Sequence, residues 1–323
     1  TAAYQNAYEE EDGNKFCYAG AIAGINEGEI KNCEVYIGTV RAENAKTVSA
    51  GGITGWNRQG AKITGCFNKA VVSTNEPKGD DAVSGGIAGQ NHGTIESCFN
   101  EGVISAASEK GAHAGGITGY TYSCVITDCF NTALGVITAD GNIHAAAGGI
   151  VGSCDAMSKI STCYSMGENT AEITNENGEA GTLKGAGGIV GIITTNSQSG
   201  YVRNCYYLDT TAQDGFGHIV GSVRAGDSAA AGFENQFTYQ PFYNGFDFVK
   251  KWYFEPAGGY QYAHLREFQK TFKISVKAVP SRGDSAGGTA AVEEGYGERF
   301  MPGALVPLKA AANEGYYFLD WTV

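Results

Sequence analysis

The sequence predicts an all-β protein: a parallel β-helix-like solenoid of about six coils with an aromatic C-terminal cap, followed by a small β module. Two observations support this prediction. A phrase of six small and apolar residues recurs six times along the first two thirds of the chain. Each copy is followed by an apolar residue, two variable residues and a cysteine. Repeats of roughly 20 to 50 residues are typical of solenoids, in which each repeat forms one turn.

The repeated phrase places two glycines between a small residue and an Ile or Val. Its copies are Ala19–Gly24, Ala50–Gly55, Ser84–Gly89, Ala114–Gly119, Ala147–Gly152 and Ala186–Gly191, and the first has Ala21 in place of the second glycine. Glycine is too frequent here for a helix interior, and it allows a backbone with positive φ. We therefore predict a sharp corner of positive φ at the glycines of every coil.

Each repeat contains three short apolar stretches, which predict three short parallel strands per coil. Each strand would stack on its counterpart in the next coil, about 4.8 Å away. The cysteine follows its apolar partner by three residues, as Cys66 follows Ile63. This odd step would place the two side chains on opposite faces of a single strand. We predict a bend between them, so that both point inward.

The cysteines form the main structural column that the repeat predicts: Cys33, Cys66, Cys98, Cys129, Cys163 and Cys205. In-register parallel strands carry their Cβ atoms side by side rather than toward each other, which disfavours disulfides. We expect buried, unpaired thiols that act as small hydrophobes. Cys124 and Cys154, in one linker of neighbouring coils, remain an alternative pair. Asn26, Asn57 and Asn91 share another column and predict an amide ladder at a turn.

The chain divides into three predicted segments. Residues 1–206 carry the solenoid repeats. Residues 207–268 lose the repeat but keep many aromatic residues. Because an open solenoid end exposes strand edges and apolar interior, we predict a terminal coil and cap there. Residues 269–323 form the predicted β module, which begins with the alternating pattern of Thr271–Ala278.

The repeated phrase, read as G-G-[IV]-x-G followed by [IV]-x-x-C-[FY], resembles the GLUG motif of large bacterial surface proteins. Six copies cover about residues 19 to 206; the first also departs from the pattern at Glu34, where the aromatic residue is expected. The C-terminal part resembles a divergent internalin-type B-repeat, with Gly315–Trp321 as the signature GY-x-F-x-x-W. These resemblances imply a β-helix-like fold and a location on the bacterial cell surface.

Charge and hydropathy exclude two classes of partner. The net charge of −12 argues against a nucleic-acid binder, because such proteins carry basic surfaces. No apolar stretch approaches the roughly 18 residues of a membrane span. The chain begins at Thr1 without Met or a signal peptide. We therefore expect a monomeric fragment of a longer, processed chain.

Candidate chemical motifs point away from catalysis. Gly283–Gly288 fits G-x-S-x-G, but a nucleophile elbow requires a strand-turn-helix unit in a large α/β sheet. His113 and His144 precede the glycines of neighbouring coils at different offsets, so no metal site is predicted. Trp56 and Tyr120 follow the phrase and suit stacking on sugars, but they lie in coils that are not adjacent. We predict no catalytic residue and no cofactor.

One short motif suggests cell adhesion. Arg282, Gly283 and Asp284 form an RGD tripeptide in a glycine-rich loop between two predicted strands. Loops at such positions are exposed and carry recognition residues more often than strands do. The motif is a candidate adhesion loop, and an ordinary turn is the alternative reading.

Together these features predict a non-catalytic segment of a large bacterial cell-surface protein, acting outside the cell as a stalk or as an adhesive surface. Its ligand would be a host protein or a glycan. Two alternatives remain. A carbohydrate-active β-helix enzyme would need paired carboxylates at facing positions of neighbouring coils. An accessory region of a surface peptidase would have its catalytic domain elsewhere in the full-length protein.

Overall fold

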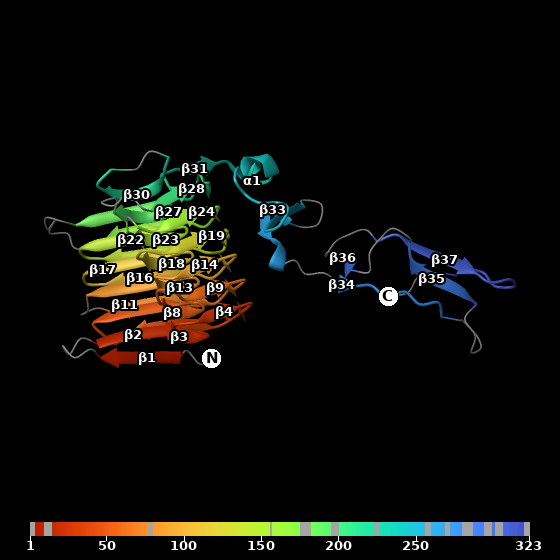
Figure 1. The fold of residues 1–323 in the computed structure, drawn as a ribbon, viewed down its shortest axis with the longest axis horizontal. Helices are drawn as coiled ribbons and strands as arrows, with labels where there is room; N and C mark the ends of the chain where they lie inside the picture. Colours follow the sequence, from red (N-terminus) through yellow and green to blue (C-terminus); the bar gives the residue numbers. More distant parts are fainter. Residues whose placement is uncertain are drawn as a thin grey trace. The chain divides into compact units, whose positions relative to one another are not determined.

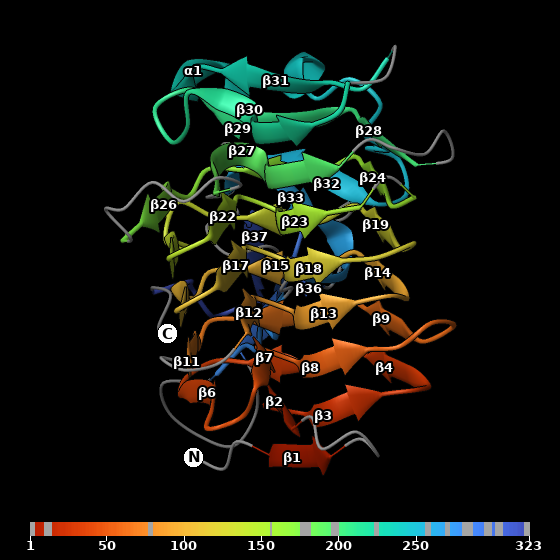
Figure 2. The same ribbon diagram turned by 90° about the vertical axis from the view of Figure 1, so that its left-hand side faces the viewer.

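The computed structural model describes residues 4–9, 15–76, 80–155, 157–174, 182–194, 200–222, 226–255, 260–268, 272–279, 287–293, 299–300 and 306–319. The chain forms two compact units, Thr1–Lys251 and Trp252–Val323. The first unit is a parallel β-solenoid of about five turns, whose strands stack coil upon coil in Figures 1 and 2. The sequence predicted about six coils because the phrase occurs six times. Six copies enclose only five complete turns between the first and the last, which explains the difference. The three predicted domain boundaries stay predictions.

Sheet A forms two adjoining columns of parallel strands, one on each side of the glycines. The first column contains β2 (Lys15–Gly20), β7 (Thr47–Gly51), β12 (Asp81–Gly85), β17 (Gly111–Gly115) and β22 (His144–Gly148). The second contains β3 (Ala23–Asn26), β8 (Thr54–Asn57), β13 (Ala88–Asn91), β18 (Thr118–Thr121) and β23 (Val151–Cys154). The long strand β27 (Leu183–Thr194) pairs with both columns, so in the last full coil one strand runs through the whole phrase.

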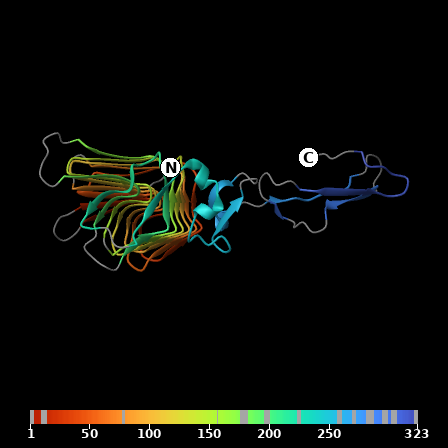
Figure 3. The same ribbon diagram turned by 90° about the horizontal axis from the view of Figure 1, so that it is seen from above.

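Three further sheets complete the coil. Sheet B contains β4 (Glu29–Lys31), β9 (Lys62–Thr64), β14 (Thr94–Glu96), β19 (Val125–Thr127), β24 (Lys159–Ser161) and β28 (Tyr201–Arg203). Sheet C contains β5 (Glu34–Val35), β10 (Phe67–Asn68), β15 (Phe99–Asn100), β20 (Phe130–Asn131), β25 (Tyr164–Ser165), β29 (Cys205–Leu208) and β31 (Ala229–Gly232). Sheet D contains β6 (Thr39–Glu43), β11 (Val71–Glu76), β16 (Ile104–Ser108), β21 (Ile137–Gly141) and β26 (Asn169–Ile173). Seen from above, successive coils overlie one another (Figure 3).

A complete coil therefore has five short strands rather than the predicted three, because two of the apolar stretches are bent. The bend predicted between the apolar residue and the cysteine is confirmed. It lies at the residue just before the cysteine, where φ is between +51° and +62° from Gly65 to Thr162. Both flanking side chains are buried, as Ile63 and Cys66 show. The left-handed residue thus turns the chain from sheet B into sheet C while keeping both side chains inside.

The glycines of the phrase do not have the positive φ that the sequence predicted. They are required by close packing instead. A Cβ atom at Gly86 would overlap the carbonyl oxygen of Gly116 in the next coil and approach the Asn100 side chain of sheet C. The equivalent Cβ at Gly52 would overlap the carbonyl oxygen of Gly86 in the same way. The glycines therefore let two sheets of the same coil, and successive coils, approach more closely than any side chain permits.

The interior has a wide part and a narrow part. Between sheets A, B and C, the column of Ile53, Ile87, Ile117, Ile150 and Ile189 packs with the cysteine column. Between sheet D and the first column of sheet A, the core contains mostly alanine, such as Ala50, Ala82, Ala114, Ala106 and Ala139. Small residues there bring two sheets close together, because protein interiors pack at high density without voids.

The two ends of sheet A are covered by strands outside the repeat. At the first coil, β1 (Tyr4–Glu9) pairs with β2 in the antiparallel sense. At the last coil, β30 (Asp214–Val220) pairs with β27, and β31 pairs with β29 in sheet C. The chain then forms the short helices α1 (Glu234–Phe237) and η1 (Gln240–Phe242), whose aromatic residues belong to the predicted cap.

The second unit contains short antiparallel pairs. β32 (Trp252–Glu255) pairs with β33 (Tyr260–Leu265), which leads into η3 (Arg266–Phe268). β34 (Phe272–Lys273) pairs with β36 (Arg299–Phe300), and β35 (Gly288–Val292) pairs with β37 (Leu308–Ala312). A small β module at the end of the chain is therefore present, as predicted.

The glycine packing gives a direct stability test. We expect Gly86→Ala to lower the free energy of unfolding by at least about 2 kcal/mol, because its Cβ would overlap the backbone of the next coil. Gly28→Ala is the matched control, since its Cβ would meet no atom within 4 Å. Urea denaturation measures both variants. Equal midpoints for the two would contradict the packing explanation.

Candidate functional site

The structure places the six repeat cysteines in one column at the start of sheet C. All nine cysteines of the chain are free, including Cys124 and Cys154. Every thiol of the column donates a hydrogen bond to the carbonyl two residues earlier, as from Cys98 to Glu96 at 3.2 Å and from Cys163 to Ser161 at 3.1 Å. The thiol therefore serves as a weak donor next to the bend and as a small apolar side chain inside the core.

Burial makes the thiols of the central coils chemically inert, whereas Cys33 in the first coil is only partly buried, contrary to the expectation for the whole column. Cys98, Cys129 and Cys163 are fully buried, and the pKa of each thiol is raised well above its ordinary value, chiefly because burial disfavours the thiolate. Burial likewise raises the pKa values of Cys124 and Cys154 to about 12. Because the thiolate is the nucleophile and the metal ligand, the column supports the fold rather than a reaction.

Two asparagine ladders run along the solenoid. The predicted one is confirmed: Asn26 donates to Asn57, and Asn57 to Asn91, each at 2.8 Å. The next residue of this column is Thr121, and Asn91 Nδ2 has no hydrogen-bond partner among the described residues. The ladder thus ends inside the protein at Asn91 of the third coil, because the fourth coil has Thr121 at this position.

Sequence reasoning missed the second ladder, in sheet C. Asn68 donates to Asn100 and Asn100 to Asn131, each at 2.9 Å, and Asn131 donates to Ser165 at 3.4 Å. Each amide also accepts from or donates to the backbone two to four residues later, as Asn100 does at Gly102. The signal was present in the recurring Cys-Phe-Asn triplet, but the repeat pattern extended only as far as the aromatic residue.

An aromatic column runs beside this ladder on the outer side of sheet C. Phe67, Phe99, Phe130 and Tyr164 stack with ring centroids 4.8 to 5.0 Å apart. Rings from the segment after β31 pack against the last rungs: Phe237 and Tyr243 contact Tyr164, and Phe242, Tyr243 and Phe246 contact Tyr206. The predicted cap therefore closes the aromatic column at its end.

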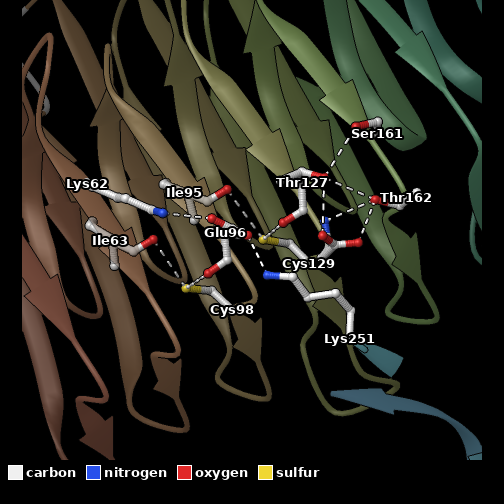
Figure 4. A network of polar contacts seen from close by, with 11 residues as sticks. Lys62, Ile63, Ile95, Glu96, Cys98, Thr127, Cys129, Ser161, Thr162 and Lys251 are labelled. Atoms are coloured by element: carbon white, nitrogen blue, oxygen red, sulfur yellow. Dashed lines mark hydrogen bonds and ion pairs between the residues drawn. The ribbon is translucent and has the colours of Figure 1, made fainter. Parts of the chain in front are cut away.

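The same segment is held further down the solenoid by an ion pair. Glu96 of β14 lies between Lys62 and Lys251, with a Glu96–Lys62 distance of 2.8 Å (Figure 4). The hydrogen bond from Lys251, and then that from Lys62, lowers the pKa of the Glu96 carboxyl. Residues 155 positions apart in the chain are thus joined. Nearby, Thr127, Asp128 and Thr162 form a hydroxyl and carboxylate network between neighbouring coils (Figure 4).

A patch that we call the aromatic-polar face lies on the outer side of the second column of sheet A. Its first row contains Trp56, Gln90, Tyr120 and Ser153, which are in register on β8, β13, β18 and β23. Its second row lies two residues later in each coil, on the same side of the chain. That row contains Arg58, His92, Tyr122 and Asp155, whose backbones bond from coil to coil. The sequence singled out Trp56 and Tyr120, which the structure places in one column with Gln90 between them.

Neighbouring rings hold the start of this face. Tyr18 stacks on Trp56 at 5.2 Å, and the Arg58 guanidinium lies 4.4 Å from the Trp56 ring. His92 contacts Trp56 at 5.5 Å and Tyr122 at 5.7 Å. Burial lowers the pKa of His92 and raises that of Tyr120. Both side chains are therefore uncharged at neutral pH.

A histidine cluster adjoins the face on the first column of sheet A. His113 Nδ1 and Ser153 Oγ share a hydrogen bond of 2.7 Å, and His113 Nε2 lies 3.9 Å from the Asp81 carboxylate. Asp81 and His144 flank Gly111 in neighbouring coils. Burial, and then His113, lowers the pKa of His144, and its Nδ1 has no partner among the described residues. His113 and His144 thus lie on one surface, which their offsets in the sequence did not indicate.

Other sequence candidates find less support. Arg282, Gly283 and Asp284, together with most of the serine motif, lie outside the described residues. Within the described part of the chain, no group of three His, Cys, Asp or Glu side chains is arranged to hold a metal ion. The helices described in both units are too short and too polar to span a membrane.

Comparisons with known proteins give one distant likeness. No family model matches the chain, and no curated protein matches its sequence. Among solved structures, it is similar to a protein from Bacteroides ovatus described as a "putative immunoglobulin A1 protease", with 16% sequence identity and a TM-score of 0.39. The match covers 74% of this chain and 75% of that one. At this level of sequence identity and structural similarity, the match does not support any assignment of function to the chain.

The buried cysteine column can be tested by comparing two substitutions at one site. We expect Cys129→Asp to destabilise the protein by several kcal/mol, because a carboxylate in an apolar stack has no partner. Cys129→Ala should lower the free energy of unfolding by only about 1 to 2 kcal/mol, since it leaves a small cavity. Thermal melting monitored by circular dichroism measures both. Similar melting temperatures for the two variants would show that the column faces solvent.

The Glu96 ion pair predicts a dependence of stability on pH. Its pKa is lower in the folded protein than the ordinary value of 4.5, so its contribution is present at neutral pH and is lost as the pH falls through the folded-state pKa. We expect Glu96→Gln to lower the urea midpoint at pH 7 and to match the wild type at about pH 2, where carboxyls are protonated. Glu101→Gln, at an ion pair outside this segment, is the control. A difference that stays constant with pH would contradict this role.

Proposed function

We propose that this chain is a non-catalytic segment of a large bacterial cell-surface protein, where it acts as a rigid stalk that carries a binding surface. The observation that supports this most directly is the unbroken stacking of the coils. Every sheet of the solenoid is paired from one coil to the next, and two amide ladders and one aromatic column reinforce the stack.

The chemistry of the described residues favours binding over catalysis. The thiols of Cys98, Cys129 and Cys163 are fully buried, and burial raises the pKa of each. A glycosidase requires two carboxylates that face each other. Asp81 instead faces His113, and one Asp155 oxygen is occupied by hydrogen bonds from Ser123 and Ser158. Ser153, His113 and Asp81 are arranged in the order of a catalytic triad. The backbone N–H groups around them are used in strand pairing, so they are not available to stabilise an oxyanion.

The two alternative functions differ in what would reveal them. A carbohydrate-active enzyme would release products from a polysaccharide. An accessory region of a surface peptidase would occur in a full-length chain that also contains a peptidase domain, so the full-length sequence decides that case. The resemblance of the repeat to the GLUG motif motivates the bacterial surface location in either case.

The surface location can be tested on the organism that encodes the protein. An antibody raised against this chain should stain intact, unpermeabilised cells, and mild protease treatment of these cells should remove the signal. A cytoplasmic protein of the same cells is the control and should stain only after permeabilisation. Staining that requires permeabilisation would overturn the proposed function.

A further inference from the structure

We propose that the aromatic-polar face binds a neutral glycan chain that lies along the axis of the solenoid. The inference deepens the proposed function, on which it rests, by naming the class of ligand. The residues that would contact the glycan are Tyr120 and Tyr122 as ring platforms, with Gln90, His92 and His113 as polar partners.

The rings provide surfaces that suit the C–H faces of sugars. Tyr122 is 46% exposed, and Tyr120 of the preceding strand is half-buried beside it. Trp56 is fixed by Tyr18 and Arg58, so it forms a firm border of the patch. Tyrosine offers an apolar ring and a polar hydroxyl on one side chain, with few rotatable bonds to order on binding. Rigid rings beside planar polar groups are what recognition of a polyhydroxylated ring requires.

Polar groups of the face remain available to hydroxyls. Gln90 lies between Trp56 and Tyr120 in the first row. In the second row, His92 lies between Arg58 and Tyr122 and contacts the rings of Trp56 and Tyr122. Trp56 Nε1 and His144 Nδ1 have no hydrogen-bond partner among the described residues, but both atoms are buried below the surface and are not counted as contacts to the glycan. The amide of Gln90 both donates and accepts, which suits the hydroxyl groups of a sugar.

The charges of the face indicate a neutral ligand. Arg58 is paired with Glu27, Asp81 lies beside His113, and Asp155 accepts hydrogen bonds from serines. Burial keeps His92 and His144 uncharged at neutral pH, because it lowers the pKa of both. The net charge of −12 repels anionic polymers over a longer range. A glycan without charged groups is not repelled by the net negative charge and needs no charged partner on this face.

The coil repeat indicates a polymer rather than a single sugar. In-register parallel strands present equivalent positions about 4.8 Å apart, and the face extends over β8, β13, β18 and β23. A linear polymer can contact several of these positions at once. The backbones of these strands are paired on both sides, so a peptide cannot add to them as another strand. This arrangement favours a glycan over an extended peptide.

The test uses the whole chain and a panel of soluble neutral polysaccharides: dextran, mannan, xylan, galactan and a mixed-linkage glucan. Native gels that contain each polysaccharide should retard the wild-type chain in at least one case. Titration calorimetry with that polysaccharide should give a dissociation constant raised about tenfold or more in Tyr122→Ala, because hot-spot rings dominate such interfaces. Tyr122→Phe keeps the ring and should retain most of the affinity.

Tyr239→Ala is the matched control, because Tyr239 is 62% exposed and lies outside the face. Its affinity should equal that of the wild type. Tyr122 is exposed, so its substitution should leave the fold intact, and circular dichroism verifies that each variant is folded. No retardation by any polysaccharide, or equal affinities for Tyr122→Ala and wild type, would overturn the proposal. Binding of a peptide library that Tyr122→Ala abolishes would also overturn it.

Two readouts separate this inference from the proposed function. Reducing ends released from the bound polysaccharide would show catalysis, which overturns the non-catalytic function but supports glycan recognition. An intracellular location on antibody staining would overturn the surface role without affecting the affinity measured for the purified chain. Failure of either statement is therefore visible separately.

Discussion

Parallel, in-register pairing of each coil with the next is the constraint on which the rest of the solenoid depends. Once register is fixed, each strand residue of an inner coil lies between two residues of the same column, such as Ile87 between Ile53 and Ile117. A side chain that fits one coil then fits the next, and one that clashes does so repeatedly. The glycines of the phrase show this strongly, because a Cβ atom at Gly52, Gly86 or Gly116 meets the same carbonyl oxygen in the adjacent coil. The repeat in the sequence is the record of that geometry.

Much of the fold could be predicted because columns repeat. The cysteines, the bend before each of them and the first asparagine ladder all recur at fixed offsets, and the structure contains the bend and the ladder. The reason for the glycines could not be inferred, because close approach between coils is a property of tertiary packing and positive φ is the more familiar cause. The five strands per coil were missed because the corner at the glycines and the bend before the cysteine each divide one apolar stretch into two separate strands.

The candidate binding surface was harder to predict, for a different reason. Its residues differ from coil to coil: the row of Trp56, Gln90, Tyr120 and Ser153 has no repeating chemistry. Residues that recur in every copy are those that stacking of the coils requires. Residues that recognise a ligand lie at the other positions, where the side chain can vary from coil to coil. Contacts across columns, such as His113 with Ser153 at 2.7 Å, join residues 40 positions apart and become visible only when the coil is closed. The same holds for the Glu96–Lys251 ion pair.

The two asparagine ladders give the solenoid an electrical direction. In both, each side-chain amide donates toward the later coil, from Asn26 to Asn91 and from Asn68 to Ser165. Backbone groups in sheets alternate in direction, so their dipoles largely cancel, but these amide dipoles all point the same way. They add as peptide dipoles do in a helix. The positive end of the first row of amide dipoles therefore lies at Asn91, inside the protein. The aligned dipoles make the two ends of the solenoid electrostatically different, even though its coils are nearly identical.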